Sequence, residues 1–299
     1  MHIRQVFLSL VVFVSALSWV VPTAWAEIRE DGAPGSALSV GDAVAAQAVG
    51  ATALYFNPAG MSRVQQYAIE TGYNFAGALE GHTFSAAAVD SKTNGNIAMG
   101  LGYAYVSSIL SGEDRDGNVL RGALSTGFRS KDFSVFAGIG GRYSTLVRGE
   151  EDTEDNLGSD DIEFFTLDAG LMAEFSGVFS LGLVGRNLID TKNLQEAPRT
   201  IGVGIGGQFK EFSVSADLNV DLQSEEEAVL AYAVGAQLLV QNMVVLRVGY
   251  NGGGLTKTNY MSAGLAYVSK LVGADLAFRQ SIDGASETSF SLAVKVFMP

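Results

Sequence analysis

From about residue 66 to the C-terminus, apolar and polar side chains alternate in stretches of about ten residues. Segment 212–222 shows this most clearly, with its Phe, Val, Ala and Leu side chains on one face and its Ser, Asp and Asn side chains on the other. A period of two predicts a β-strand whose two faces meet different surroundings. The pattern recurs about fourteen times, separated by turn residues and without a helical break. This predicts a membrane barrel rather than a soluble sandwich.

Fourteen strands are expected, and bacterial single-chain barrels also have even strand counts. The expected ranges are 66–77, 82–90, 96–108, 119–129, 131–147, 161–175, 177–187, 198–210, 212–222, 228–241, 243–250, 258–269, 271–281 and 288–298. From residue 130 onward, tight turns alternate with longer links such as 148–160 and 188–197. Short periplasmic turns and longer outer loops are typical of such barrels. The links at 78–81 and 91–95 do not follow this alternation.

One face of each expected strand is apolar, as in 198–210, where Ile201, Val203, Ile205 and Phe209 share a side. An Arg or Lys facing lipid at mid-depth costs about 2–4 kcal/mol, so the charged faces are expected to line the lumen. The candidate lumen charges are Glu70, Arg121, Arg142, Asp168, Glu174, Arg186, Asp217, Arg247, Asp275, Arg279 and Lys295. Buried charges need partners, which predicts ion pairs across the barrel or to an inserted plug. The alternative is a wide water-filled porin in which these residues set ion selectivity.

The N-terminus predicts export. Arg4 precedes an apolar run over residues 6–21, and the tripeptide at 24–26 has the small-x-small form of a cleavage site. The alternative, a membrane anchor, is disfavoured because the run is short for spanning. We expect a signal peptide at 1–26, a plug segment rich in small residues at 27–65 and a barrel at 66–299, in the outer membrane of a Gram-negative bacterium.

The amino-acid composition limits the classes of partner and ligand that the protein can bind. The chain has no cysteine, which excludes disulfides and thiolate metal sites. Its 19 Lys and Arg residues stand against 32 Asp and Glu residues, a balance that disfavours nucleic acid as a partner. The same composition also fits a large secreted β-protein, so composition alone does not assign the compartment.

Three motifs have simple structural explanations. The glycines of segment 201–207 lie within a strand and open no helix, so a nucleotide loop is disfavoured. Segment 114–118 has its glycine too early for an EF-hand and reads as a surface turn. His82, the only histidine beyond the expected cleavage site, has no obvious catalytic partner. We therefore expect no enzyme, no metal site and no cofactor.

One turn is more informative. Segment 51–61 contains Asn57, Pro58, Ala59 and Gly60 just before the first expected strand. Proline fixes φ, and asparagine can hydrogen-bond neighbouring backbone, so the turn either anchors a plug to the wall or simply leads into the strand. This segment resembles the N-terminal region of FadL-like outer-membrane proteins (FadL/TodX type, including the PorV/PorQ-like branch). Segments 242–250, 260–267 and 271–278 resemble the closing strands of the PorV-like branch.

The resemblance implies an all-β, 14-stranded antiparallel transmembrane β-barrel with an N-terminal plug-like segment. It further implies passive transport of small hydrophobic molecules such as fatty acids. The alternative is a PorV-like non-transport barrel that binds partner proteins in secretion or surface attachment. Outer-membrane lipid and lipopolysaccharide would be partners in either case. The chain departs from the family at Val49-Gly50, where an acidic pair is common, in its compact loops, and in its C-terminus, which ends in Met298-Pro299 rather than an aromatic residue. These departures weaken the inference of transport more than that of fold.

Overall fold

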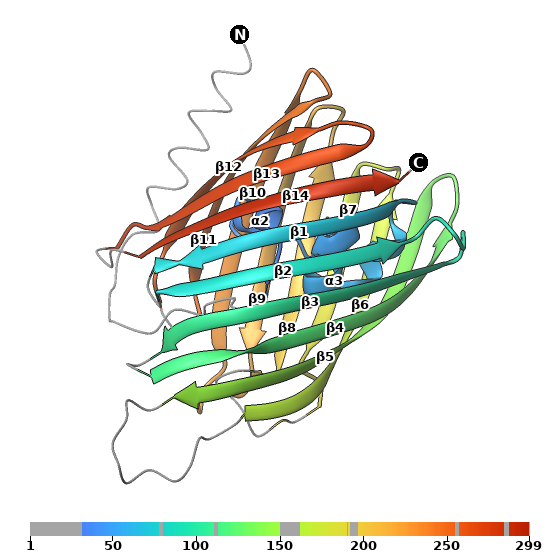
Figure 1. Cartoon of the computed structure of the whole chain (residues 1–299). Coiled ribbons are helices and arrows are strands. Elements are labelled where there is room, and N and C mark those ends of the chain that lie inside the picture. The colour runs from blue at the N-terminus through green and yellow to red at the C-terminus, as the bar shows by residue number, and fades with distance from the viewer. Residues whose placement is uncertain are drawn as a thin grey trace, which may run out of the picture.

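The computed structural model describes residues 32–77, 80–110, 113–149, 162–189, 191, 197–254, 257–283 and 287–298. The expected signal peptide lies outside these residues. Fourteen strands form one closed antiparallel barrel, which confirms the expected all-β class and strand number (Figure 1). The strands are β1 (Tyr67–Ala76), β2 (Gly81–Asp90), β3 (Ile97–Leu110), β4 (Glu113–Arg129), β5 (Phe133–Gly149), β6 (Ile162–Phe175), β7 (Phe179–Arg186), β8 (Thr200–Gln208), β9 (Phe212–Asp221), β10 (Val229–Val240), β11 (Val244–Gly253), β12 (Tyr260–Val268), β13 (Val272–Ser281) and β14 (Thr288–Met298).

The barrel closes where the last strand pairs with the first. Strand β14 runs antiparallel to β1, from the pair Tyr67 and Met298 to the pair Ala76 and Ser289. Every other strand pairs with its neighbours in the sequence. Because no strand is left at an edge, the backbone groups of the wall bond to one another, as a barrel in lipid requires. We call the region formed by β13, β14, β1 and β2 the seam wall.

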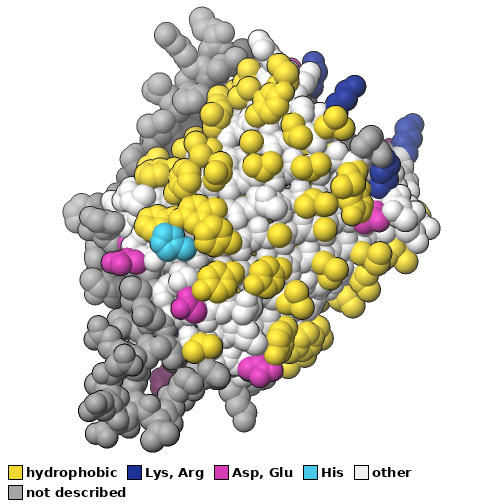
Figure 2. Space-filling view, in the orientation of Figure 1, with side chains coloured by type: hydrophobic (Ala, Val, Ile, Leu, Met, Phe, Trp, Pro, Cys, Tyr) yellow, Lys and Arg dark blue, Asp and Glu magenta, His cyan; other side chains and the backbone are white. Residues whose placement is uncertain are grey.

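The alternation of side chains places large apolar residues outside. In β8, for example, Ile201, Val203 and Ile205 are 42%, 49% and 56% exposed, and the residues between them are buried. Figure 2 shows apolar side chains spread over the outer surface, with Lys and Arg gathered toward the end at which β14 finishes. A contiguous apolar outer belt of this extent marks a surface that contacts something other than water.

The third hairpin differs from the expectation. The sequence predicted a loop over residues 109–118, but β3 runs to Leu110 and β4 begins at Glu113. Above the apolar belt, the outer face of a strand meets water and can be polar, so the apolar alternation fades while the strand continues. Tyr105 of β3 donates a hydrogen bond to Asp116 of β4 across this extension, at 3.3 Å.

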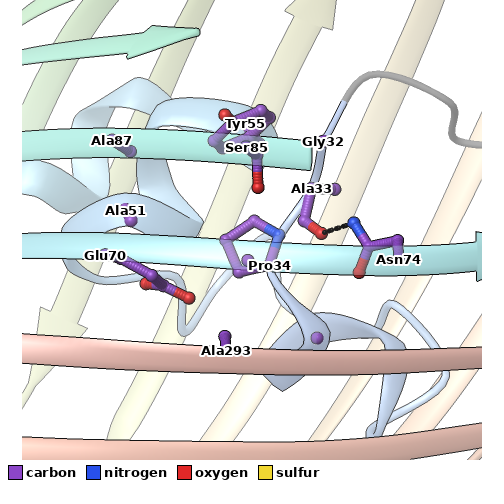
Figure 3. Close-up of a pocket in the computed structure, with 12 residues that line it drawn as sticks. Gly32, Ala33, Pro34, Ala51, Tyr55, Glu70, Asn74, Ser85, Ala87 and Ala293 are labelled. Atoms are coloured by element: carbon purple, nitrogen blue, oxygen red, sulfur yellow. Dashed lines mark hydrogen bonds between the residues drawn. The ribbon is translucent and has the colours of Figure 1, made fainter. Parts of the chain in front are cut away.

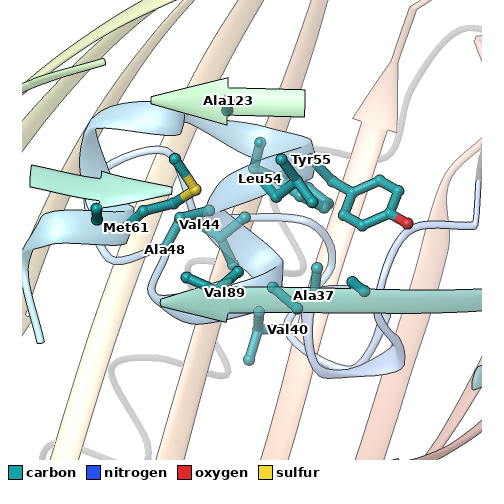
Figure 4. Packing of buried hydrophobic residues seen from close by; sticks show 14 residues of the cluster. Ala37, Val40, Val44, Ala48, Leu54, Tyr55, Met61, Val89 and Ala123 are labelled. Carbon is teal, nitrogen blue, oxygen red and sulfur yellow. The ribbon is translucent and has the colours of Figure 1, made fainter. Parts of the chain in front are cut away.

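The chain before the barrel lies inside it. We call residues 32–63 the inner segment, which contains the helices α2 (Gly35–Leu38), α3 (Gly50–Phe56) and the 3₁₀ helix η1 (Pro58–Ser62). These short helices sit within the ring of strands (Figure 1). Their apolar side chains pack with Val89 and Ala123 of the wall to form the largest buried cluster (Figure 4). Among the residues described, no helix is long and apolar enough to cross a membrane.

Candidate functional site: the inner segment and its contacts in the lumen

Asn57 joins the inner segment to the barrel wall. It is fully buried between α3 and η1. Its amide nitrogen donates to Ala45 O at 2.8 Å and to Leu171 O of β6 at 3.3 Å. Its amide oxygen accepts from Ala59 N at 3.2 Å and so caps the first turn of η1. Pro58 follows at the first position of η1, where a missing N–H costs nothing.

We expect Asn57→Ala to loosen the inner segment. The substitution leaves three buried backbone groups without this partner, at about 1–3 kcal/mol for each group that stays unpaired. Limited proteolysis of the detergent-purified protein measures the effect as faster cleavage between residues 32 and 63. The matched control is Asn94→Ala, because the Asn94 side chain caps only an exposed turn through Asn96 N. Equal cleavage of both variants would show that Asn57 does not hold the segment.

Glycines let the inner segment lie directly on strand backbones. A β-carbon at Gly182 of β7 would collide with the carbonyl of Ala45. A β-carbon at Gly138 of β5 would stand 2.7 Å from Pro58 O. Similar collisions with the inner segment would occur at Gly170, Gly204, Gly235, Gly249 and Gly264. The wall from β5 to β12 therefore accepts the inner segment only because side chains are missing there.

Five of the candidate lumen charges contact the inner segment. Arg121 of β4 stacks on Tyr55 of α3, with 5.1 Å to the ring centroid. Asp217 accepts hydrogen bonds from Val44 N at 2.8 Å and from Ala45 N at 2.7 Å. Arg186 donates to Phe56 O at 3.2 Å. The other two charges form ion pairs: Glu174 with Arg63 at 2.7 Å and Arg279 with Asp42 at 3.5 Å.

The other candidate charges have partners within the wall, and Arg121 has partners in both places. Lys295 of β14 lies 3.4 Å from Glu70 of β1 and 3.0 Å from Asp275 of β13, which also pairs with Arg247 of β11. This four-residue network crosses the seam wall. A second group joins β4 to β6 through Arg121 and Asp168, 3.8 Å apart. Arg142 stacks on Phe164 with 5.1 Å to the ring centroid and donates to Asn187.

Among the lumen charges that the sequence reasoning missed are two in the inner segment. Arg63 donates to Glu174 of β6, to Gln208 of β8 at 3.2 Å and to Gln47 O, so it ties the end of the inner segment to the wall. Asp42 sits in a turn with Gly41, and both have positive φ, 65° and 64°. Neither residue lies in an alternating strand, so strand periodicity could not find them. The small residues around Asp42 were the only available sign of tight packing.

Two small cavities remain between the inner segment and the seam wall. The first, of about 10 Å³, is lined by Gly32–Gly35 and by wall residues that include Glu70 and Asn74 (Figure 3). The second, of about 40 Å³, is lined by Leu38, Asp42 and Arg279 among others. A water needs roughly 10–15 Å³ by this measure, so the two spaces admit only a few waters. In the part of the chain that the structure describes, neither cavity is large enough to hold a solute bigger than a few waters.

Comparison with known proteins places the chain by its fold. No family model and no curated protein sequence matches it. Among solved structures, it is similar to the CymD monoaromatic hydrocarbon channel, with a TM-score of 0.65 and 14% identity over 90% of this chain and 97% of that one. The toluene transporter TbuX of Ralstonia pickettii gives 0.60 and 13%, over 90% and 98% of the two chains. The toluene transporter TodX of Pseudomonas putida gives 0.61 and 14%, over 89% and 98%. At these identities the likeness establishes a shared barrel fold.

Proposed function

We propose that the protein is an outer-membrane barrel of a Gram-negative bacterium that lets small hydrophobic molecules pass without an energy source or cofactor. The observation that carries the proposal is the inner segment in the lumen of a closed 14-strand barrel with an apolar outer belt. Lipid and lipopolysaccharide are the proposed surroundings of the belt. Proteins of the same fold are described as hydrocarbon channels and toluene transporters. In this proposal the inner segment is a plug and the protein is not an enzyme.

Passage requires the plug to move, because the cavities beside it admit only waters. The plug is held by hydrogen bonds and ion pairs, and the polar groups in them can bond to other partners. A molecule that enters from the outer end would meet the apolar cluster of α3 and leave when the plug shifts. A fatty acid and an aromatic hydrocarbon are the two cargo classes to compare first, since the resemblance implies the former and the similar structures the latter.

Uptake by cells tests the proposal. We expect a Gram-negative strain that lacks its own hydrophobic-compound channels to take up radiolabelled toluene or oleate faster when it carries this protein.

The variant Ser62→Cys/Ser125→Cys supplies the control. Ser62 of η1 and Ser125 of β4 are hydrogen-bonded side chain to side chain, and the chain has no other cysteine. Oxidation should tether the plug and stop uptake, and reduction should restore it. Uptake equal to that of cells without the protein would contradict transport.

A second candidate is a barrel that binds partner proteins in secretion or surface attachment. The filled lumen and its ion pairs favour this reading, because a scaffold needs no passage. The disulfide of the Ser62→Cys/Ser125→Cys variant distinguishes the two functions. A scaffold keeps its full activity when the plug is fixed, whereas a channel loses it.

A further inference from the structure

The inner segment is packed unevenly against the two sides of the lumen. On the side of β5–β9 it touches strand backbone at several glycines, and Asn57 and Asp217 bind its backbone directly. On the opposite side, both cavities lie between it and part of the seam wall, which it still touches where Gly35 packs against Ser291 of β14. The polar contacts on that side include the hydrogen bond of Asn74 to Ala33 O at 3.1 Å and the 3.5 Å pair of Arg279 with Asp42. The seam side is therefore where the lumen already holds space beside the inner segment.

The two cavities adjoin each other. Both are lined by Ala33, Pro34 and Asn74. Asn74 donates a hydrogen bond to Ala33 O at 3.1 Å (Figure 3), and both residues line both cavities. Separation of this bonded pair would widen the space beside β1 and β14.

Buried polar atoms without a hydrogen-bond partner lie along this space. Among the residues described, they include Arg279 Nε, Glu70 Oε1 and Ser291 Oγ, on side chains of residues that are 9%, 7% and 1% exposed. Arg279 lines the larger cavity and Glu70 the smaller one. Ser291 lies against Gly35 of the inner segment. Such groups are costly to bury unpaired, so they favour a ligand that can bond to them.

The chemistry of these atoms selects the ligand. Arg279 is already paired with Asp42, and Glu70 with Lys295, so each charge has its counter-charge. The atom of Arg279 without a hydrogen-bond partner is an N–H donor, and that of Glu70 is an acceptor oxygen. A hydroxyl group both donates and accepts, so it can bond to each in turn. A carboxylate would be repelled at Glu70, and a hydrocarbon would satisfy neither.

We propose that the seam side of the lumen is the solute path, and that it takes small neutral molecules bearing a hydroxyl group, with Arg279 and Glu70 as successive hydrogen-bonding positions. This inference rests on the proposed function and narrows its cargo from hydrophobic molecules in general to hydroxylated ones. The apolar walls contributed by Ala33, Pro34, Leu38 and Ala293 hold the rest of the molecule.

Cysteine labelling tests the path without requiring transport. Ser291→Cys places a thiol on the seam wall, and Ser180→Cys of β7 places one on the opposite side. The two serines are 1% and 2% exposed, and both hydroxyls lack a partner. We expect the neutral reagent hydroxyethyl methanethiosulfonate to modify Ser291→Cys at least tenfold faster in the detergent-purified, folded protein. Equal rates, or faster modification of Ser180→Cys, would overturn the path.

Protection of the same thiol tests the ligand class. Benzyl alcohol is expected to slow modification of Ser291→Cys severalfold, whereas toluene and benzoate at the same concentration leave it unchanged. The added substitution Glu70→Gln in Ser291→Cys should weaken the protection. Equal protection by toluene, or stronger protection by benzoate, would overturn the hydroxyl preference. If benzyl alcohol protects the thiol but cells carrying the protein take up no labelled solute, the binding path stands and the proposed transport falls.

Discussion

Lys295→Met is expected to lower the free energy of unfolding of the barrel by about 3–5 kcal/mol, because it removes one partner from a buried ion-pair network. Lys295 lies 3.4 Å from Glu70 and 3.0 Å from Asp275. The side chains of these two carboxylates are only 8% and 4% exposed. Without the lysine, Glu70 loses its ion-pair partner, and Asp275 keeps only Arg247. The measurement is a urea titration of protein refolded in lipid vesicles, with electrophoretic mobility reporting the folded fraction.

Lys210→Met is the control for this prediction. Lys210 also forms an ion pair, with Glu211 at 3.8 Å, but its side chain is 92% exposed, and exposed pairs contribute little. We expect no measurable shift for it. The double variant Lys295→Met/Glu70→Gln should recover part of the loss, because it also removes the carboxylate that is left without an ion-pair partner. An unfolding midpoint for Lys295→Met equal to that of Lys210→Met would contradict a stabilising role for the network.

Gly138→Ala is expected to displace the inner segment from the wall. The new β-carbon would lie 2.5 Å from Ala59 N and 2.7 Å from Pro58 O. Both neighbours are backbone atoms of η1, which cannot move away as the end of a flexible side chain can. Displacement breaks the Asn57 contacts in the same region and opens the lumen. Single-channel recording in planar bilayers measures the result, which is stable ion conductance where the parent protein has little.

Gly140→Ala separates this steric effect from any general effect of alanine in β5. Gly140 lies two residues along the same strand on the same face, but its nearest contact for a β-carbon is at 3.5 Å, an ordinary packing distance. We expect its conductance to match the parent protein. If Gly138→Ala also conducts like the parent and migrates as a folded barrel, the close fit between η1 and β5 does not hold the lumen shut.

The sequence determined the barrel. The period-two alternation, as in residues 212–222, depends only on which side chains face lipid, so it can be read one strand at a time. The start of β4 at Glu113 was not predicted, because the alternation of apolar and polar side chains holds only within the apolar belt. Beyond the belt the outer face is hydrated, and Asp116 there resembles a loop residue in sequence alone. The candidate lumen charges follow from the same reasoning, which does not extend to charges outside the alternating strands such as Arg63.

Only the tertiary structure decided how the lumen is filled. The contacts of Asn57 with Leu171, of Asp217 with Val44, and of Arg63 with Glu174 join residues more than 100 positions apart. No local period relates such positions, because the inner segment follows neither the helical nor the strand repeat over any useful length. Its place is set instead by where strand glycines leave room and where wall side chains offer hydrogen bonds. Those conditions exist only once the strands have closed around it.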